Sequence, residues 1–412
     1  MLQIYLMKNQ KAALGFIFVT VLIDVIGLGI IIPVIPKLIM ELSGENISQA
    51  SRYGGLLMFM YAFMQFIFAP ILGGLSDQFG RRPILLISLL GLGLDYLLVA
   101  FSSTLWWLFL ARLIAGIGGA SFTTASAYIA DISLPEKRTQ NFGMLGAAFG
   151  LGFIFGPVIG GILGNIGSRI PFFAAAGLAL VNWLYGYFIL PESLSKSNRR
   201  PFKLSRANPF GTFNQLKRHP LIIGLSVALF FTYIAHHATQ STWAYFTIER
   251  FSWSETEVGY SLGFVGLMIV LVQGLIIRHA VKFMGQIKAV YAGLGFNMLG
   301  MLLIAFTTQG WMIYAVMFPY ALGGLAGPTM QAMMSAKVTS DQQGELQGGL
   351  TSLMSVTSII GPLLMTTVFA FFTAAHTIFY FPGAPFILGT ILSGLGLIFS
   401  FKTLKGTYNR SM

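Results

Sequence analysis

The chain has 412 residues, of which 55% are hydrophobic and only 9% are charged; its net charge is +12 and it contains no cysteine. Soluble domains carry about 25% charged residues, so this composition excludes an ordinary water-soluble protein. The lack of cysteine excludes disulfides and thiolate metal sites. Apolar runs of about 20 residues recur along the chain, the length at which a helix crosses a bilayer core. The strands of a membrane β-barrel would alternate apolar and polar residues instead.

The first apolar run, LGFIFVTVLIDVIGLGIIIPVIP, is longer than the apolar region of a signal peptide and contains Asp24 near its middle. We therefore expect a retained membrane span. Eleven further spans follow, so the sequence predicts an all-α membrane protein with twelve transmembrane helices. The predicted spans cover residues 12–40, 52–75, 84–101, 105–130, 139–164, 171–190, 220–249, 255–281, 289–307, 311–336, 346–373 and 385–401.

The predicted connections are short except for the one between the sixth and seventh spans. That segment, PESLSKSNRRPFKLSRANPFGTFNQLKRH, is polar, basic and contains proline, which is typical of a linker. We therefore predict an N-terminal six-helix half at residues 1–190, a basic linker at 191–219, and a C-terminal six-helix half at 220–412.

Lysine and arginine are distributed unequally between the two sides of this topology. When both termini and the linker share one side, that side holds 20 of the 25 basic residues. Arg112 lies inside a span, and the other side holds only Lys37, Arg52, Arg169 and Arg250. Cytoplasmic loops are enriched in Lys and Arg, so we expect both termini and the linker in the cytoplasm. The same rule accounts for the net positive charge of the chain, so we do not expect a nucleic acid as a partner.

The two halves resemble each other when the chain is shifted by 205 residues, which aligns FGPVIGG with IGPLLMT and PEKRTQNFG with SDQQGELQG. Parallel repeats of six helices place a substrate site near the bilayer midplane, between the halves. The charges are not repeated. The first half carries Asp24, Asp77 and Arg112; the matching residues of the second half are Leu229, Lys282 and Met317. Coupling by titratable groups is therefore expected in the first half.

Three charged residues lie inside predicted spans: Asp24, Asp95 and Arg112. A charge near the bilayer centre costs at least about 2.5–3.5 kcal/mol, and such residues mostly line a transport pathway. The functional interpretation is proton coupling, with Asp24 and Asp95 as carboxyls that hold or release a proton. The structural alternative is an ion pair, such as Asp24 with Arg112, that only fixes helix packing; Asp95 has no obvious partner in the sequence.

Other energy sources and chemistries have no support in the sequence. No GxxxxGK[ST] loop is present, so direct use of ATP is not expected. The acids are scattered over different spans, and we find no nucleophile motif and no metal-ligand cluster. We therefore expect neither an enzyme nor a resident cofactor or metal.

Four motifs in the expected spans resemble those of the major facilitator superfamily, in its drug/proton antiporter branch: IDVIGLGIIIP, GGLSDQFGRRP, LFLARLIAGIGG and GFIFGPVIGG. Longer stretches, including AYIADIS, LPES and GELQGGL, are similar to the tetracycline/proton antiporters of Gram-negative bacteria. The similarity covers nearly the whole chain. It implies a major facilitator fold of two six-helix halves in the bacterial inner membrane, and exchange of a drug for protons.

The resemblance assigns roles to single positions. Asp24, Asp95 and Arg112 match membrane residues important for coupling, and Gln65 matches a polar position at the drug site. The gating loop matches Gly73, Asp77, Gly80, Arg81 and Arg82. The antiporter motif matches Gly152, Gly156, Pro157, Gly160 and Gly161.

Three positions depart from the family pattern. Where the family has an aspartate in span nine, this chain has Asn297, and the apparent match to a family histidine in span eight is Ile269. Neither residue can exchange a proton. Gln78 stands where the gating loop usually has a basic residue. Either coupling runs through the first-half acids alone, or the stoichiometry and substrate differ from those of the family.

Small residues let membrane helices approach closely, so the spacing of Gly152, Gly156, Gly160 and Gly164 predicts a packing groove along span five, bent by Pro157. Shaping of the interface between halves is a further implication of the resemblance.

In the gating loop, Gly73 and Gly74 are expected to let span two pack closely, and Gly80 permits a tight turn. Arg81 and Arg82 are expected to face the cytoplasm. As a hypothesis, Asp77 bridges to Arg81 and to the N-terminal end of span eleven, near 344–348, and so locks the halves together.

A drug cavity with aromatic walls and few polar anchors is expected from polar and aromatic residues of several spans. Candidate cavity residues are Gln65, Phe231, Tyr233, His236, Gln240, Trp243, Asn297 and Gln331. Helix packing is the alternative role of Trp243. His236 and His237 point about 100° apart on a helix, so one of them is expected to pack or to form an interhelical hydrogen bond.

The sequence thus predicts a monomeric proton-driven exporter of a small amphipathic drug, tetracycline-like and carried as a metal chelate, or a wider range of drugs. One alternative is a proton-coupled exporter of a native metabolite or siderophore, motivated by Asn297 and Ile269. Another is a transporter-like receptor or scaffold without flux, against which the intact motifs and titratable residues argue.

Overall fold

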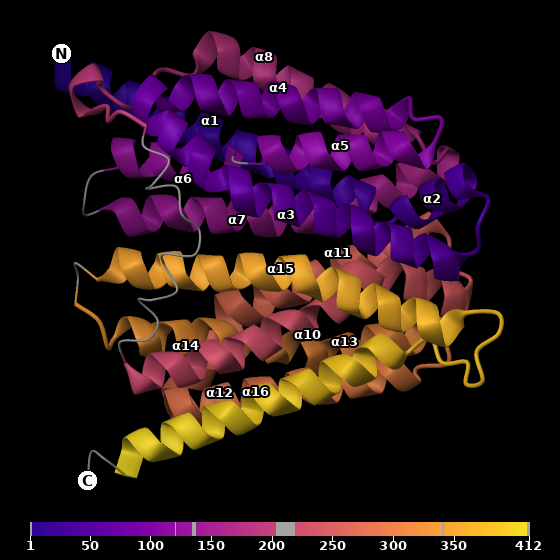
Figure 1. The fold of residues 1–412 in the computed structure, drawn as a ribbon. Coiled ribbons are helices and arrows are strands. Elements are labelled where there is room, and N and C mark those ends of the chain that lie inside the picture. The colour runs from indigo at the N-terminus through magenta and orange to yellow at the C-terminus, as the bar shows by residue number, and fades with distance from the viewer. Residues whose placement is uncertain (1, 120, 134–136, 203–218, 340–341, 410–412) are drawn as a thin grey trace. The chain divides into compact units, whose positions relative to one another are not determined.

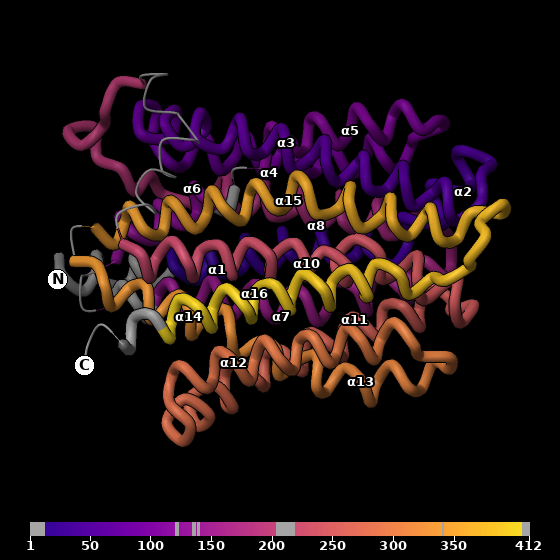
Figure 2. Tube along the Cα trace, turned by 60° about the horizontal axis from the view of Figure 1, so that its bottom comes forward, coloured from indigo at the N-terminus to yellow at the C-terminus, as the bar shows by residue number. Residues whose placement is uncertain are grey.

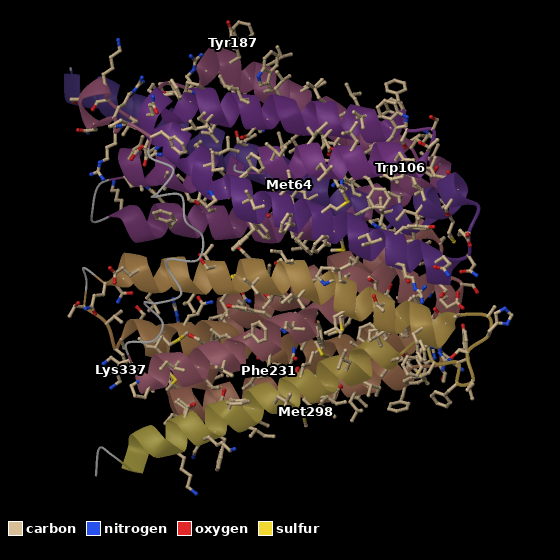
Figure 3. The ribbon with its side chains drawn as sticks, in the orientation of Figure 1. Met64, Trp106, Tyr187, Phe231, Met298 and Lys337 are labelled. Atoms are coloured by element: carbon tan, nitrogen blue, oxygen red, sulfur yellow. The ribbon has the colours of Figure 1, made fainter. Side chains whose placement is uncertain are left out.

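The computed structural model describes residues 2–119, 121–133, 137–202, 219–339 and 342–409 (Figure 1). The greater part of the predicted linker, residues 203–218, lies outside this description. Eleven helical segments of the described residues are long and apolar enough to cross a membrane. Many of their large apolar side chains face outward, for example Trp106, which is 80% exposed, and Tyr187 at 52% (Figure 3). Such a surface requires lipid rather than water around it.

The chain forms two compact units. The first comprises residues 1–43, 60–208 and 254–263, and the second comprises 44–59, 209–253 and 264–412. Each unit thus takes one short segment from the other half of the sequence. The first turns of α3 (Ile47–Phe79) belong to the second unit, and the start of α11 (Glu255–Leu271) belongs to the first.

Eight helices and one short 3₁₀ turn cover the described part of the chain up to residue 202. They are α1 (Leu2–Ile31), α2 (Ile35–Ser43), α3 (Ile47–Phe79), α4 (Arg81–Ala100), α5 (Leu105–Gly118), α6 (Ser121–Ile132), α7 (Arg138–Ile166), α8 (Ile170–Ile189) and η2 (Lys196–Asn198). The core of this unit gathers Phe16, Leu85 and Tyr128 from three different helices.

The predicted span at 12–40 is not one continuous helix. The structure ends α1 at Ile31 and begins α2 at Ile35. Pro33 has no backbone N–H, and its ring would clash with the carbonyl of residue 29 in a continuing helix. The carbonyl of Gly29 instead accepts the N–H of Ile32 in a turn, at 3.3 Å.

The described part of the chain from residue 219 onward contains the remaining elements. They are α10 (Pro220–Phe251), α11 (Glu255–Leu271), η4 (Val272–Ile276), α12 (Ile277–Phe306), α13 (Gly310–Leu322), η5 (Gly323–Leu325), α14 (Ala326–Ser335), α15 (Gln343–Thr373) and α16 (Ala384–Asn409). Leu225, Leu294 and Leu350 are among the buried residues of the second unit's core.

The run from Glu255 to Phe306 is 52 residues long, which is enough for two membrane crossings. As one straight helix it would extend about 78 Å, more than twice the thickness of a bilayer core. Gly285 breaks it, with a φ of 78° and a ψ of 163°. The tube turns back on itself in this region (Figure 2). With this break, the eleven apolar segments supply the twelve predicted crossings.

Candidate functional site

Asp95 on α4 and Arg112 on α5 form an ion pair inside the first unit. Asp95 Oδ2 lies 2.5 Å from Arg112 Nη2, and the two side chains are 0% and 17% exposed. From the sequence, Asp95 had no obvious partner, and the ion pair given as an example of the structural alternative joined Asp24 to Arg112. The structure supplies a partner for Asp95, because α4 and α5 are rotated so that the two side chains meet. Opposite charges on adjacent helices offset part of the cost of burying each one.

Two tyrosines lie near the Asp95–Arg112 pair. Tyr61 on α3 and Tyr96 on α4 both lie within electrostatic range of Asp24, Asp95 and Arg112. The Tyr96 ring packs against α1 at Gly27, where a Cβ would meet the phenol oxygen at 3.0 Å. The structure therefore brings Asp24, Asp95 and Arg112 into one electrostatic cluster, drawn from three helices.

Gln65 lies one turn along α3 from Tyr61. Its amide nitrogen donates to the carbonyl of Gly119 at 3.0 Å and lies 3.5 Å from the Tyr61 hydroxyl. Gln65 is only partly buried. It therefore forms part of the polar surface next to the charged cluster, while its drug contact stays a prediction.

The loop between α3 and α4 is held by ion pairs centred on Arg81. Arg81 Nη1 lies 2.6 Å from Asp77 Oδ1, and Arg81 Nε lies 3.1 Å from Asp131 Oδ2 on α6. Only 12% of the Arg81 side chain is exposed. The expected bridge from Asp77 to Arg81 is confirmed. The guanidinium also crosslinks α3 and α6, while the expected cytoplasmic location of Arg81 stays a prediction.

The start of α4 is capped by a carboxylate from the segment that follows α8. Glu192 accepts the backbone N–H of Arg81 at 2.8 Å and that of Arg82 at 3.3 Å. These N–H groups have no partner within the helix, and the helix N-terminus attracts negative charge. Gly80 precedes them with a φ of 107°, so the tight turn expected there is confirmed.

Arg82 contacts α8, and the glycines of the loop differ from expectation. The Arg82 guanidinium donates to the Tyr187 carbonyl at 2.7 Å and lies 5.9 Å from the Tyr187 ring, so it is anchored on α8, and its cytoplasmic location stays a prediction. Gly74 faces the ring of Phe202, a linker residue, and nothing lies within 4 Å of the Cβ position of Gly73. The two glycines therefore do not mediate helix packing of span two.

The glycines of α7 form the expected packing face. A Cβ on Gly152 would meet Val25 Cβ at 2.7 Å, and one on Gly156 would meet the carbonyl of Ile26 at 2.8 Å. Gly160 likewise faces α1, Gly164 faces Val34 in the turn between α1 and α2, and Gly161 faces the start of α11. Pro157 lies within α7 and packs against Gly29. The groove predicted from the spacing of four residues is confirmed.

The second unit contains a buried polar chain through α10, α12 and α16. His236 Nε2 lies 2.9 Å from Asn297 Nδ2, and Ser393 Oγ lies 2.8 Å from Asn297 Oδ1. Asn297 is 1% exposed. His237 packs against Gly361 of α15. One of the two histidines was expected to pack or to form an interhelical hydrogen bond. His237 does the first and His236 the second, and a cavity role of His236 stays a prediction.

The remaining cavity candidates of the second unit are placed as follows. Gln331 donates to the Tyr233 hydroxyl at 3.0 Å. Phe231 stacks on Phe399, with ring centroids 5.7 Å apart. Gln240 is exposed. Trp243 is 1% exposed and packs against Phe246 and Phe386. Its surroundings favour the packing role. Binding of a substrate by these residues stays a prediction.

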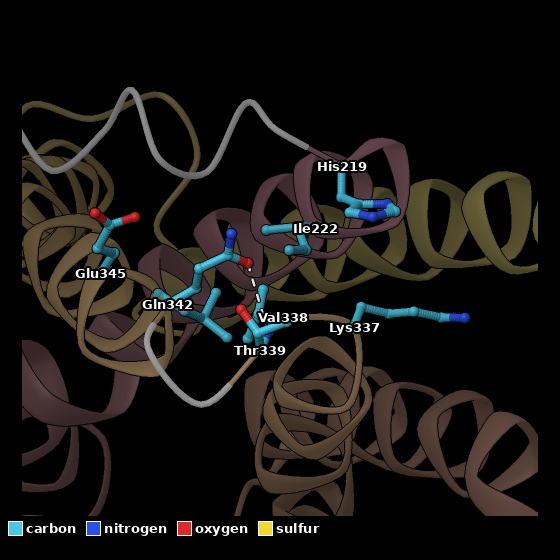
Figure 4. Close-up of a pocket in the computed structure, with 8 residues that line it drawn as sticks. His219, Ile222, Lys337, Val338, Thr339, Gln342 and Glu345 are labelled. Carbon is cyan, nitrogen blue, oxygen red and sulfur yellow. Dashed lines mark hydrogen bonds between the residues drawn. The ribbon is translucent and has the colours of Figure 1, made fainter.

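A cavity of about 300 Å³ lies within the second unit, at the ends of α10, α14 and α15 (Figure 4). His219, Lys337, Gln342 and Glu345 are among its lining residues. It contains none of the residues predicted to contact a drug.

A model of the family described as "Major Facilitator Superfamily" matches residues 17–324. The chain belongs to the major facilitator superfamily. The resemblance inferred from the four motifs is thereby confirmed.

Tetracycline resistance proteins are among the most similar relatives of this superfamily member. The class C protein of Escherichia coli is 43% identical over 364 residues, which cover 88% of this chain and 91% of the relative. The class H protein of Pasteurella multocida is 37% identical over 396 residues, covering 95% and 96%. The alignments thus extend over nearly the whole length of both proteins.

Solved structures show the same fold. The human organic anion transporter MFSD10 aligns with a TM-score of 0.70 at 23% identity, covering 95% of this chain and 99% of that one. A bacterial homologue of the lysosomal transporter Spinster, inward-facing and occupied, aligns with a TM-score of 0.77 at 15% identity, covering 95% and 96%. The predicted fold class, two six-helix halves of a major facilitator, is confirmed.

Several residues of this transporter's site were not singled out from the sequence. Tyr61 and Tyr96 flank the charged cluster, Asp131 and Glu192 hold the loop, and Ser393 completes the polar chain. Asp131 and Glu192 lie in AYIADIS and LPES, stretches already noted for their similarity. These two acids could have been considered from the sequence as partners of the loop residues Arg81 and Arg82.

Proposed function

We propose that this chain is a secondary active transporter that exports an amphipathic drug, tetracycline-like or of wider range, in exchange for protons. The Asp95–Arg112 pair carries the proposal, because it is a buried, titratable ion pair within the spans of a major facilitator. Relatives named as tetracycline resistance proteins, at 37–43% identity, support a drug as the substrate.

The geometry provides a physical basis for coupling. Protonation of Asp95 removes the negative charge that holds Arg112, and Asp24 is the second acid within range of the same tyrosines. A proton that enters the cluster therefore weakens a link between α4 and α5. Each proton that crosses the membrane adds about 2.3 kcal/mol of driving force per 100 mV.

In this proposal the protein acts as a monomer in the bacterial inner membrane, with both termini and the linker in the cytoplasm. The substrate binds near the bilayer midplane, and a tetracycline would be carried as its divalent metal chelate. The distribution of 20 basic residues on one side supports the orientation.

Drug-susceptibility measurements on a pump-deficient bacterial strain test the function. Expression of the protein should raise the inhibitory concentration of tetracycline or another amphipathic drug, measured with and without added Mg²⁺. Asp24→Asn should abolish this protection because it removes a titratable carboxyl, whereas Asp24→Glu retains one. Each variant must be present in the membrane in the same amount as the parent protein, and the purified variant must elute like the parent in size-exclusion chromatography. Unchanged protection in a well-expressed Asp24→Asn variant would remove Asp24 from the coupling role.

Export of a native metabolite or siderophore is the second candidate, favoured by the uncharged Asn297 and Ile269. Thermal-shift measurements on purified protein distinguish the two. Stabilisation by a siderophore or metabolite, with no response to tetracyclines, would favour the second candidate. Proton release on addition of substrate to proteoliposomes would exclude a receptor or scaffold without flux.

A further inference from the structure

His236 and its neighbour His237 are unusual within the spans of the second half. Residues 220–248, 258–277, 289–306, 310–336, 346–373 and 384–401 contain no Asp, Glu, Lys or Arg, and these two are their only histidines. Histidine is the side chain whose charge changes between about pH 5 and 8. Any proton held near neutral pH by a side chain in these stretches must therefore reside on one of these two imidazoles.

The structure distinguishes the two rings. His237 is 7% exposed, and its ring packs against the backbone of α15 at Gly361. His236 is only partly buried and forms a side-chain hydrogen bond with Asn297 on α12. Tyr320 on α13 faces the His236 ring edge-on, with centroids 6.4 Å apart. His236 is therefore the less buried of the two histidines and the one with a polar side-chain partner on another helix.

The partners of His236 can satisfy either protonation state. In the neutral state, Asn297 Nδ2 donates to His236 Nε2, and Ser393 Oγ donates to Asn297 Oδ1. The imidazole hydrogen is then on Nδ1. Both hydrogen bonds that join the three side chains are then formed.

A proton added to Nε2 reverses the direction of each hydrogen bond. His236 Nε2–H must now donate, so the Asn297 amide turns by about 180° and presents its oxygen, because an amide offers an acceptor on one side and donors on the other. Asn297 Nδ2 then donates to Ser393 Oγ, whose own hydrogen turns to Met301 Sδ, 3.9 Å away. An aspartate at position 297 would lack the donor needed for the neutral state.

We infer that His236 is a proton-binding site of the second unit, and that Asn297 and Ser393 form a rotatable hydrogen-bond relay that accommodates both of its protonation states. One proton comes from water on one side, adds to the lone pair of Nε2, and leaves to water on the other side. The inference rests on the proposed proton-coupled transport. It also differs from the expectation that all titratable coupling groups lie in the first half.

Histidine-selective ¹⁵N NMR of the full-length protein in lipid nanodiscs tests the site without any transport assay. The chain has five histidines, and the variants His236→Gln and His237→Gln identify the signals of the pair. We expect the His236 signal to change reversibly from neutral to protonated imidazole as the pH falls. We expect Asn297→Leu to eliminate the protonated signal, because it removes the partner of Nε2. A His236 that stays neutral throughout the pH range in which the protein is folded would overturn the inference.

Transport in proteoliposomes tests whether this proton is coupled to the drug. For one proton per cycle, a gradient of about one pH unit sustains about a tenfold substrate gradient, since both correspond to about 1.4 kcal/mol. His236→Gln should therefore lower pH-driven accumulation of radiolabelled tetracycline about tenfold per pH unit, while counterflow exchange without a pH gradient is retained. His279→Gln, an exposed residue of α12, is the matched control and should leave both unchanged.

The possible failures are distinguishable. Parental protein that transports no drug would contradict the proposed function, and the NMR titration would still decide the proton site. Equal accumulation by His236→Gln and the parent would show that the site, even if it titrates, carries no coupled proton and would overturn the inference.

Discussion

At the scale of single residues, the charges inside the bundle are held by partners on neighbouring helices. Asp95 has no exposed side-chain surface and depends on Arg112 for its counter-charge. Removal of one partner leaves an uncompensated charge in a medium that cannot solvate it, whereas removal of both leaves none. Variants that lack one partner or both therefore distinguish the structural role of the pair from its role in proton coupling.

Asp95→Asn should lower the free energy of unfolding by about 3–5 kcal/mol, because Arg112 then lies buried without a counter-charge. The double variant Asp95→Asn, Arg112→Gln should recover most of this loss but should not restore drug export. Denaturation of the purified proteins and drug susceptibility measure the two effects separately. A single variant as stable as the parent, or a double variant that exports drug, would contradict one of the two roles.

At the scale of elements, α7 and α1 approach each other through glycine. Gly152, Gly156 and Gly160 leave no room for a side chain against α1, and α1 carries Asp24 on the same stretch. The position of Asp24 relative to the rest of its cluster therefore depends on this close packing. Elsewhere on α7, Gly146 has nothing within 4 Å of its Cβ position and serves no such purpose.

Gly156→Ala should destabilise the protein by about 1–3 kcal/mol, because the new methyl forces two helix backbones apart. It should also weaken drug export by displacing Asp24. Gly146→Ala on the same helix is the matched control, and both properties should stay within experimental error of the parent. Thermal unfolding and susceptibility assays check both variants. Equal behaviour of the two would show that α1 accommodates the extra methyl without consequence.

At the scale of the whole molecule, the absence of cysteine makes the proposed orientation directly testable. Ser103 lies in the turn between α4 and α5 and Ser197 lies in η2, and both are exposed. The proposed topology places them on opposite sides of the membrane. Asymmetric distribution of basic residues is the physical reason to expect Ser197 on the cytoplasmic side.

In intact cells, a membrane-impermeant maleimide should label a Ser103→Cys variant, and should label Ser197→Cys only after the inner membrane is permeabilised. Mass spectrometry of the purified protein measures the labelled fraction, and the parent chain supplies the background. Labelling of Ser197→Cys in intact cells would reverse the proposed orientation.

The sequence by itself determined the class of protein, the twelve crossings and the residues that bear charge inside the membrane. These properties follow from local quantities: the length of each apolar run, the cost of a charge in hydrocarbon, and the distribution of Lys and Arg over the loops. The glycine spacing of α7 also predicted its packing face, because residues four apart share one side of a helix.

Only the tertiary structure decided which charged and polar groups meet. Arg112 pairs with Asp95, Arg81 links Asp77 to Asp131, and His236 joins Asn297 and Ser393. These contacts depend on the rotation of each helix about its own axis and on its choice of neighbours. In a span that is apolar on nearly every face, the sequence does not distinguish the residues that face lipid from those that face other helices. The rotation of each helix about its axis is therefore set by its packing against its neighbours, which exists only once the helices are assembled.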